Sequence, residues 1–380
     1  MKHILFSIAA FCLITTMISC SKTKSTDLPL PKVRLESVYI TTDNGTLLSY
    51  GVYTGVKNWE VITKGNCEGT PVLYKEKIYF VTKTGYFYAV DILTGKALIE
   101  TNIGIIPESS TSIAINNDKI YLSSSKLYCL NLSGVQIWSY DPTVPCKTSP
   151  TVVNGFVFVG IDVNNGAGVA GRCISVNATT GLLNWQSNPI AFGPVVSSPS
   201  VSNSVVYYGG TDNFVYAIYE INGSSKWQFS TTDKVQSSPM VYGGMCIVGS
   251  DDFGIYCIDT TSGLLRWEYQ TAERVSSSPT VHETSNTVLV GSYDFNLYAI
   301  DHVTGALRWK YPAGSLIKSS PVVYGFYVYF TSFDRYIYCV DIRDGRLIWK
   351  SFMNGNSQSS PIVDDLANGI FPSVSGMSKY

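Results

Sequence analysis

Short apolar runs separated by turn-forming residues make up most of the chain. Runs such as 288–290 and 297–300 are rich in Val, Ile, Leu and aromatic residues, and clusters of Gly, Asn, Asp and Ser stand between them. Runs of this length with such boundaries are typical of β-strands and tight turns. No part of 21–380 shows a sustained helical period. The pattern therefore predicts an all-β protein.

These runs recur with a period near forty residues. Prolines 199, 239, 279, 321 and 361 are spaced by 40, 40, 42 and 40 residues, and each follows a pair of serines. A period of this length indicates a solenoid or a propeller. All seven tryptophans occupy one place in the repeat: Trp59, Trp138, Trp185, Trp227, Trp267, Trp309 and Trp349. Ile99 fills that place in one more copy, which makes eight repeats. With about four strands per repeat, the prediction is an eight-bladed β-propeller of four-stranded antiparallel blades.

Both ends of the chain hold an incomplete repeat. Trp59 ends a repeat that has no proline start before it, and Pro361 starts one that has no tryptophan after it. We therefore predict that 35–59 and the strand after Pro361 form one blade together. A blade shared by the N- and C-terminal strands closes the ring and removes a free sheet edge.

The most regular residues of the repeat have structural explanations. Asp301 stands four residues before Gly305 and eight before Trp309, and other copies keep this spacing. An Asp side chain bonds to the backbone of its own turn, and Gly accepts a positive φ. Trp is large and flat and has an N–H that needs a partner. We therefore expect each tryptophan to pack between neighbouring blades.

The N-terminal segment predicts export. Lys2 and His3 precede an apolar run over 4–18, which is short for a membrane-spanning helix, and Cys20 follows it. This arrangement resembles a bacterial lipoprotein signal over 1–20, with Cys20 acylated, for instance by palmitate. Residues 21–34 are expected to be a flexible tether, and 35–380 the propeller. The predicted location is the bacterial envelope, lipid-anchored at the outer membrane, on its periplasmic side or at the cell surface. The alternative is an ordinary secretory signal with an incidental cysteine.

Composition narrows the class of partner. The formal net charge is −1 with 14% charged residues, and no basic patch stands out, so nucleic acid is not expected as a partner. Seven of the nine cysteines lie beyond the predicted signal, and most of them replace Ala or Val of other copies. We expect them to be small core residues. A disulfide in an oxidising compartment stays open, but its pairing does not follow from the spacing.

The repeat is similar to that of the pyrroloquinoline-quinone (PQQ) propeller family. Its tryptophan-docking motif is matched by Ala299, Asp301, Thr304, Gly305 and Trp309, and the match extends from about 35 to 361. The resemblance implies one of two kinds of protein. Quinoprotein dehydrogenases use PQQ, calcium, a catalytic Asp and often two adjacent cysteines. The other kind is a non-catalytic lipoprotein of the outer-membrane β-barrel assembly machinery.

This chain has neither adjacent cysteines nor a Cys-x-x-Cys-His haem motif. The resemblance therefore implies a scaffold without catalytic residues, metal or cofactor, which docks on an envelope protein, and more specifically on the outer-membrane β-barrel assembly complex. One alternative is a propeller that binds PQQ or another ligand, including a reduced quinoprotein. Another is a surface glycan-binding propeller.

Four acidic residues at equivalent places are the first candidate interaction residues. They stand four before the Tyr of their repeat, in the turn between the second and third strands: Asp212, Asp252, Asp294 and Asp334. One interpretation is an acidic arc that meets a basic partner or a cation. The other is an Asx turn that recurs with the repeat.

An insertion gives the second candidate surface. Residues 160–172, ending at Arg172, lengthen the turn between the second and third strands of one repeat. Loops on a rigid scaffold often carry function. In the lipoprotein kind of relative, docking uses a loop ahead of one inner strand. The resemblance points here to Phe192, in the apolar stretch 189–194, and to Arg274 in the equivalent loop of a later repeat.

Overall fold

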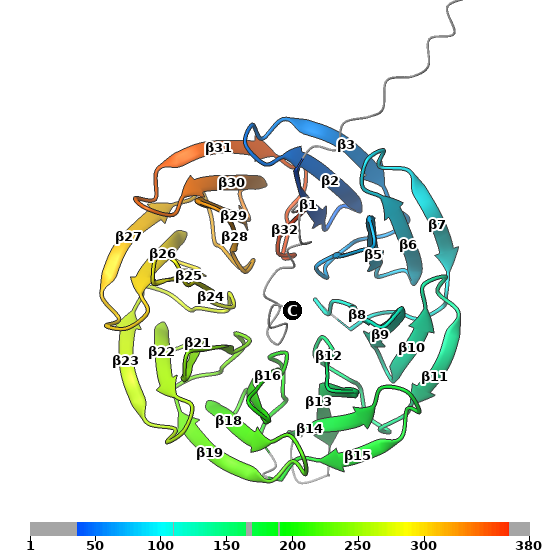
Figure 1. Cartoon of the computed structure of the whole chain (residues 1–380), viewed down its shortest axis with the longest axis vertical. Coiled ribbons are helices and arrows are strands. Elements are labelled where there is room, and N and C mark those ends of the chain that lie inside the picture. Colours follow the sequence, from blue (N-terminus) through cyan, green and yellow to red (C-terminus); the bar gives the residue numbers. More distant parts are fainter. Residues whose placement is uncertain (1–35, 109, 165–168, 189–190, 365–380) are drawn as a thin grey trace, which may run out of the picture. The chain divides into compact units, whose positions relative to one another are not determined.

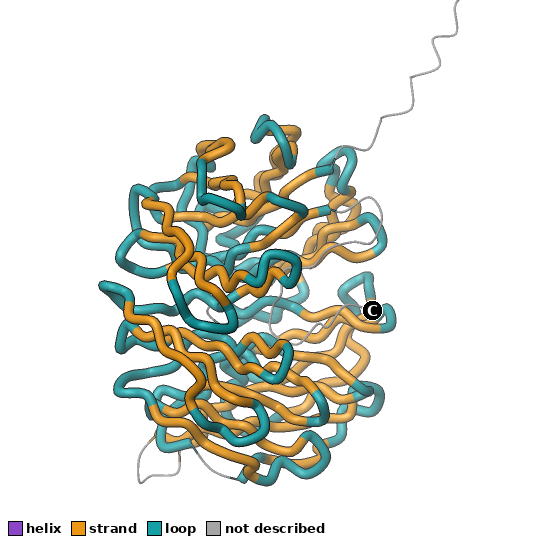
Figure 2. Tube along the Cα trace, turned by 60° about the vertical axis from the view of Figure 1, so that its left-hand side comes forward, coloured by secondary structure: helices purple, strands orange, loops and turns teal. Residues whose placement is uncertain are grey.

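The computed structural model describes residues 36–108, 110–164, 169–188 and 191–364. Within them, 32 strands form eight four-stranded sheets, and there is no helix. The sheets are arranged as blades around a central axis, so the predicted eight-bladed propeller is confirmed (Figure 1). Figure 2 shows strands and loops alternating along the described chain.

Every blade runs from a short inner strand through two central strands to an outer strand, all antiparallel. Blade 1 is β32 (Ile362–Val363), β1 (Ser37–Thr42), β2 (Thr46–Gly51) and β3 (Lys57–Ile62). Blade 2 is β4 (Val72–Tyr74), β5 (Lys77–Val81), β6 (Tyr86–Asp91) and β7 (Ala97–Asn102). Blade 3 is β8 (Ala114–Asn116), β9 (Lys119–Ser123), β10 (Leu127–Asn131) and β11 (Gln136–Tyr140). Blade 4 is β12 (Thr151–Val153), β13 (Phe156–Asn164), β14 (Val169–Asn177) and β15 (Leu183–Gln186).

The other half of the ring repeats this order. Blade 5 is β16 (Ser200–Ser202), β17 (Val205–Gly209), β18 (Phe214–Tyr219) and β19 (Ser225–Ser230). Blade 6 is β20 (Met240–Tyr242), β21 (Met245–Gly249), β22 (Gly254–Asp259) and β23 (Leu265–Gln270). Blade 7 is β24 (Thr280–His282), β25 (Thr287–Gly291), β26 (Asn296–Asp301) and β27 (Leu307–Pro312). Blade 8 is β28 (Val322–Tyr324), β29 (Tyr327–Ser332), β30 (Tyr336–Asp341) and β31 (Leu347–Phe352).

Blade 1 closes the ring as predicted. The C-terminal strand β32 pairs antiparallel with β1, with Tyr39 opposite Ile362. On the outer side, the indole N–H of Trp349 in blade 8 donates to the carbonyl of Val52 in blade 1 at 2.9 Å. The last complete blade is therefore held to a blade that contains both ends of the described chain.

The hydrophobic core lies between blades rather than in one central mass. Each of the eight blade interfaces has its own cluster of buried side chains, mostly from the two central strands on either side. Between blades 5 and 6, for example, Val215 packs with Val248 and Tyr256. The outer strands alternate between exposed and half-buried side chains, because one of their faces meets solvent.

In every blade but blade 2, a tryptophan joins the blade to the next one. The indole N–H of Trp309 donates to the carbonyl of Ile342 at 2.8 Å, and its ring lies against Gly345, which has φ +73°. A Cβ at Gly345 would lie 2.5 Å from the ring, so only glycine fits there. Ile99 pairs with Ala89 just as Trp309 pairs with Ala299, which places it at the predicted position in the repeat.

A ring of hydroxyl groups joins the inner ends of the blades. Each blade contributes the residue that stands just before the proline position of its repeat. The backbone N–H of this residue donates to the side-chain hydroxyl of the equivalent residue in the next blade, at 2.8–3.3 Å. The members in order are Thr70, Ser112, Ser149, Ser198, Ser238, Ser278, Ser320 and Ser360, and Ser360 returns to Thr70. The second serine of the repeat therefore has a specific structural role.

The described cysteines lie in the core. All seven cysteines of the described residues are buried, and none of them forms a disulfide. They occupy core positions, as expected from the residues that replace them in other copies.

The predicted signal over 1–20, the lipidation of Cys20 and the tether lie outside the described residues. Within the described part of the chain, no helix has the length and apolar character needed to span a membrane.

Candidate functional site

The two faces of the propeller carry different loops. On one face, here called the linker face, lie the turns between the second and third strands of each blade and the linkers between blades. An example is the turn at 210–213, whose Thr211 N–H donates to the carbonyl of Pro194 in the preceding linker. The opposite face, here called the turn face, carries the Asp- or Asn-to-Gly turns such as 301–305. All the predicted interaction residues belong to the linker face.

The predicted acidic residues hold the linkers in place. Asp252 accepts hydrogen bonds from the Tyr256 hydroxyl at 3.0 Å, the Thr232 N–H at 2.8 Å and the Gly254 N–H at 3.0 Å. Burial opposes the charged form, but these donors outweigh it and lower the pKa of Asp252. Burial and the nearby Asp252 carboxylate both raise the pKa of Tyr256. The Asp252 carboxylate thus accepts hydrogen bonds from its own turn, from a tyrosine and from the preceding linker.

The same contacts recur in the neighbouring blades. Asp212, Asp294 and Asp334 each accept a hydrogen bond from the tyrosine four residues later. Each also accepts one from a linker N–H, that of Phe192, Ala272 or Gly314 respectively, at 2.9–3.0 Å. Because the carboxylates are already engaged within the fold, this geometry favours the structural interpretation over an acidic arc that binds a partner directly.

The described part of the insertion in blade 4, which leaves out 165–168, extends the two central strands of the blade. Strands β13 and β14 are nine residues each and stay paired from Phe156–Asn177 to Asn164–Val169. Isolated bridges tie this hairpin to both sides, Cys146 to Ile161 and Gly171 to Ala191. The alternating apolar residues 157, 159, 161 and 163 were the sequence signal for the longer strand. The hairpin therefore extends the linker face as regular structure.

Phe192 stands beside this hairpin with its ring in solvent. Its side chain is 89% exposed, more than any other large apolar side chain among the described residues. Its N–H donates to Asp212 at 2.9 Å, and Ala191 before it bridges to Gly171. An exposed aromatic side chain on a backbone fixed at two points suits recognition, because little conformational entropy is lost when it binds.

The two predicted arginines lie in different surroundings. Arg172 is half-buried and donates to the carbonyl of Ser187 at 3.3 Å, so it braces the linker that leads to Phe192. Arg274 is exposed in the linker between blades 6 and 7, with its guanidinium 5.6 Å from the centre of the Tyr293 ring. The structure therefore brings Arg172, Phe192 and Asp212 into one region and leaves Arg274 in another blade.

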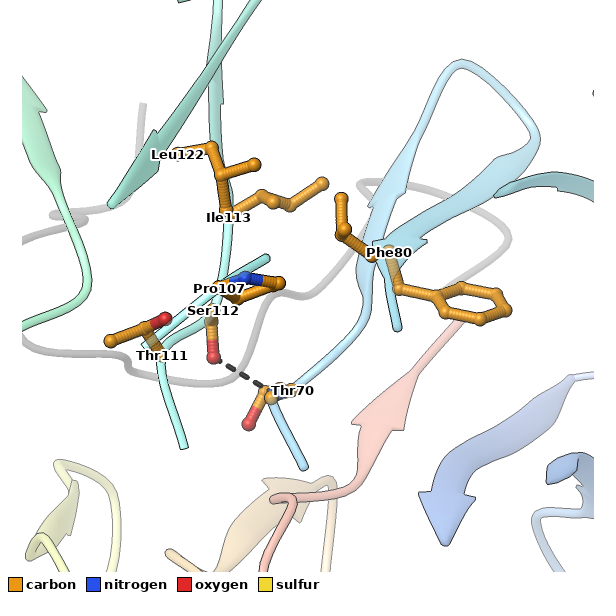
Figure 3. Close-up of a pocket in the computed structure, with 9 residues that line it drawn as sticks. Thr70, Phe80, Pro107, Thr111, Ser112, Ile113 and Leu122 are labelled. Carbon is orange, nitrogen blue, oxygen red and sulfur yellow. Dashed lines mark hydrogen bonds between the residues drawn. The ribbon is translucent and has the colours of Figure 1, made fainter. Parts of the chain in front are cut away.

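One small pocket lined by described residues gives little room for a ligand. It lies between blades 2 and 3, where Pro107, Ser112 and Ile113 face Thr70 and Phe80, and the Thr70 N–H donates to Ser112 Oγ at 2.8 Å (Figure 3). Its interior is about the size of one water molecule. Among the residues that the structure describes, no three His, Cys, Asp or Glu side chains gather as a metal site.

Comparison with known proteins agrees with the fold and its repeat. A family model described as outer membrane protein assembly factor BamB matches residues 169–367, more than half of the chain. The chain belongs to the PQQ-like β-propeller family. A curated member, quinohemoprotein alcohol dehydrogenase ADH IIB of Pseudomonas putida, is 28% identical over 148 residues, which cover 34% of this chain and 21% of that protein. The chain thus spans about a fifth of the length of that relative.

Solved structures of the same fold come from both kinds of family member. BamB from Moraxella catarrhalis superposes with a TM-score of 0.63 at 16% identity, over 76% of this chain and 87% of that chain. A europium-containing methanol dehydrogenase gives a TM-score of 0.64 at 13% identity, over 80% and 81% of the two chains. At these identities the likeness concerns the PQQ-like propeller fold alone.

Proposed function

We propose that the protein is a non-catalytic scaffold of the bacterial envelope that docks on a partner protein through its linker face. The observation that carries the proposal is Phe192, an 89% exposed ring on a backbone held by Asp212 and by the bridge from Ala191 to Gly171. An aromatic anchor of this kind is typical of protein interfaces. The adjoining hairpin of β13 and β14 widens the same surface.

The proposed location and partner are more specific. The protein would be anchored through acylated Cys20, with 21–34 as its tether, at the outer membrane. Its partner there would be the complex that assembles outer-membrane β-barrel proteins. The match to the BamB family model over 169–367 supports this choice, since that stretch contains Phe192, Arg172 and the aspartates of blades 5 to 8.

Cross-linking in the native envelope tests the proposal. The lipidated full chain is cross-linked in its own cells, purified under denaturing conditions and its partners identified by mass spectrometry. We expect the barrel-assembly protein to be recovered and to be lost with Phe192→Ala. The matched control is Ile221→Ala, because Ile221 is 86% exposed on the turn face. Equal recovery by both variants, or recovery of a different envelope complex, would contradict the proposed docking surface or the assembly role.

PQQ binding is the alternative that the dehydrogenase relative raises. The described residues do not fit it well, because the aspartates of the linker face are already bonded to tyrosines and linkers. Titrating the purified chain with PQQ and calcium, and recording the cofactor absorbance, tests this directly. We expect no saturable change, and a saturable one would overturn the non-catalytic assignment.

A further inference from the structure

One turn of the linker face holds bulky residues in a conformation that favours glycine. Among the described residues, the turn between the second and third strands has a residue of positive φ in six blades. Glycine fills it in blades 1 and 2, Gly45 and Gly85, both at φ 78°. The same position is Phe253 at φ 76° in blade 6 and Phe295 at φ 73° in blade 7. A bulky residue in the left-handed region is strained, and such strain often marks a functional position.

The fold itself gains little from these two rings. Phe253 is 39% exposed and Phe295 is 48% exposed. Among the described residues, neither ring joins any of the eight interface clusters or any aromatic pair. Blades 1 and 2 also show that glycine completes this turn. The strain at Phe253 and Phe295 is therefore not explained by packing inside the propeller.

Blade 8 continues the surface with an aromatic ring and cations. Phe352 is 49% exposed, and the guanidinium of Arg335, itself at φ 68°, lies 5.6 Å from its ring centre. The ammonium of Lys350 lies 4.8 Å from the Tyr336 ring, and that of Lys310 in blade 7 lies 5.9 Å from the Tyr298 ring. Blades 6, 7 and 8 thus each expose a phenylalanine on one face. We name Phe253, Phe295, Phe352, Arg335, Lys310 and Lys350 the aromatic arc.

The cations of the arc differ from those of the turn face. On the turn face, Arg266 pairs with Asp259 and Arg308 pairs with Asp301, each at 2.6 Å. In the part of the chain that the structure describes, no ion pair neutralises the three cations of the arc. The nearby carboxylates of Asp294 and Asp334 are bonded to Tyr298 and Tyr338 instead. The arc therefore offers apolar rings together with positive charge that has no ion-pair partner.

We propose that the aromatic arc binds an extended acidic segment of a partner protein, in which large apolar side chains alternate with carboxylates. The assignment rests on the proposed scaffold function and names a second contact beyond Phe192. The rings recur once per blade over three neighbouring blades, so an elongated ligand can meet all of them. Cations held over aromatic rings complement its carboxylates, and the strained backbone presents the rings of Phe253 and Phe295 in fixed positions.

A double glycine variant separates this role from a structural one. Phe253→Gly with Phe295→Gly, made in the full chain, removes both rings and relieves the positive-φ strain. Stability against urea is expected to stay equal or rise, while binding falls at least tenfold. Asn213→Gly is the matched control, because Asn213 has φ 72° at the same turn position and carries no ring. The control is expected to bind like the natural chain.

The probes are two sets of labelled synthetic 15-residue peptides. In one set Phe or Leu alternates with Glu or Asp, and in the other Lys replaces the acidic residues. Fluorescence polarisation is expected to detect only the acidic set, with affinity that falls as salt rises. The proposal is overturned if the acidic set fails to bind, or binds the double variant as well as the natural chain. It is also overturned if anionic vesicles or polysaccharide, and not peptides, bind in a way that needs both phenylalanines.

The cross-linking experiment keeps the two proposals apart. If Phe192→Ala abolishes recovery of the envelope partner while the double glycine variant binds and cross-links normally, the scaffold stands and the arc assignment fails. If the natural chain recovers no envelope protein, the scaffold itself fails, whatever the peptides do.

Discussion

The backbone N–H of Ser360 donates to the hydroxyl oxygen of Thr70 at 3.0 Å, across 290 positions of sequence. This bond is the last of the eight that join the inner ends of the blades. It closes at the axis the same ring that Trp349 and Val52 close further out. Two layers of contact, polar at the centre and aromatic outside, therefore hold the first and last blades together.

Replacing Thr70 by valine should weaken ring closure. Thr70→Val keeps the shape of the side chain but leaves the buried Ser360 N–H without its acceptor. A buried polar group that loses its partner costs about 1–3 kcal/mol, so the urea midpoint is expected to fall accordingly. Thr70→Ser keeps the hydroxyl and is expected to stay within about 1 kcal/mol of the natural chain. Equal stability of the valine variant and the natural chain would show that this bond contributes nothing to closure.

Asp252 should make stability depend on pH. Its pKa is lowered in the folded state, so its contribution is complete above the unfolded carboxyl pKa of about 4 and is lost as pH falls through the lower, folded value. Asp252→Asn removes this contribution and weakens the hydrogen bonds to Thr232 and Tyr256. We expect a loss of about 1–3 kcal/mol at pH 7 that shrinks below pH 4.

Urea denaturation of both proteins from pH 7 to pH 3 measures this difference. Ser133→Ala, an exposed site on the turn face, is the control, and its stability difference should not change with pH. A constant deficit of the Asp252→Asn variant at all pH values would mean that the carboxylate charge is not what holds the linker. Loss of partner binding without loss of stability would revive the acidic-arc interpretation.

The spacing of the repeated residues predicts the blades, but it does not predict several of the contacts that hold them together. Eight tryptophan-type positions and the unmatched ends at Trp59 and Pro361 were enough to predict the blades and their closure. The serine pairs were visible as a repeat, yet nothing local to Ser360 indicates a partner at Thr70, because the bond depends on the closed ring. Phe253 aligns with Gly45 and Gly85, but a positive φ at phenylalanine runs against its local preference, so only the structure reveals it.

Placing a tryptophan in the repeat that lacks one should not increase the stability of the protein. Gly134 is the glycine against which a tryptophan at position 99 would pack, but a Cβ there would already lie 2.8 Å from the Phe87 ring and 3.3 Å from Ile103. In the neighbouring interface the corresponding glycine, Gly95, faces Trp59 instead. Ile99→Trp is therefore expected to leave stability unchanged or lower it. Trp309→Ala is the contrasting variant and should cost about 3 kcal/mol.

Chemical denaturation and fluorescence of the Ile99→Trp variant test this. The added indole should emit like a solvent-exposed tryptophan, because Phe87 occupies its docking space. A blue-shifted emission together with a higher urea midpoint would show that the interface can accept the indole ring. Phe87 would then not be what occupies its docking position.

The seven described thiols should be unreactive in the folded chain. Burial raises the pKa of Cys67 and Cys129 to about 11 and that of Cys257 to about 12, so very little thiolate forms at pH 8. With the disulfide reagent DTNB, we expect none of the seven described thiols to react quickly before unfolding. All seven described thiols should react once urea unfolds the blades. Thr179→Cys adds a thiol at an exposed turn and should react quickly, which controls for the reagent. Rapid reaction of any of these seven thiols before unfolding would mean that one blade opens far more readily than its buried cluster indicates.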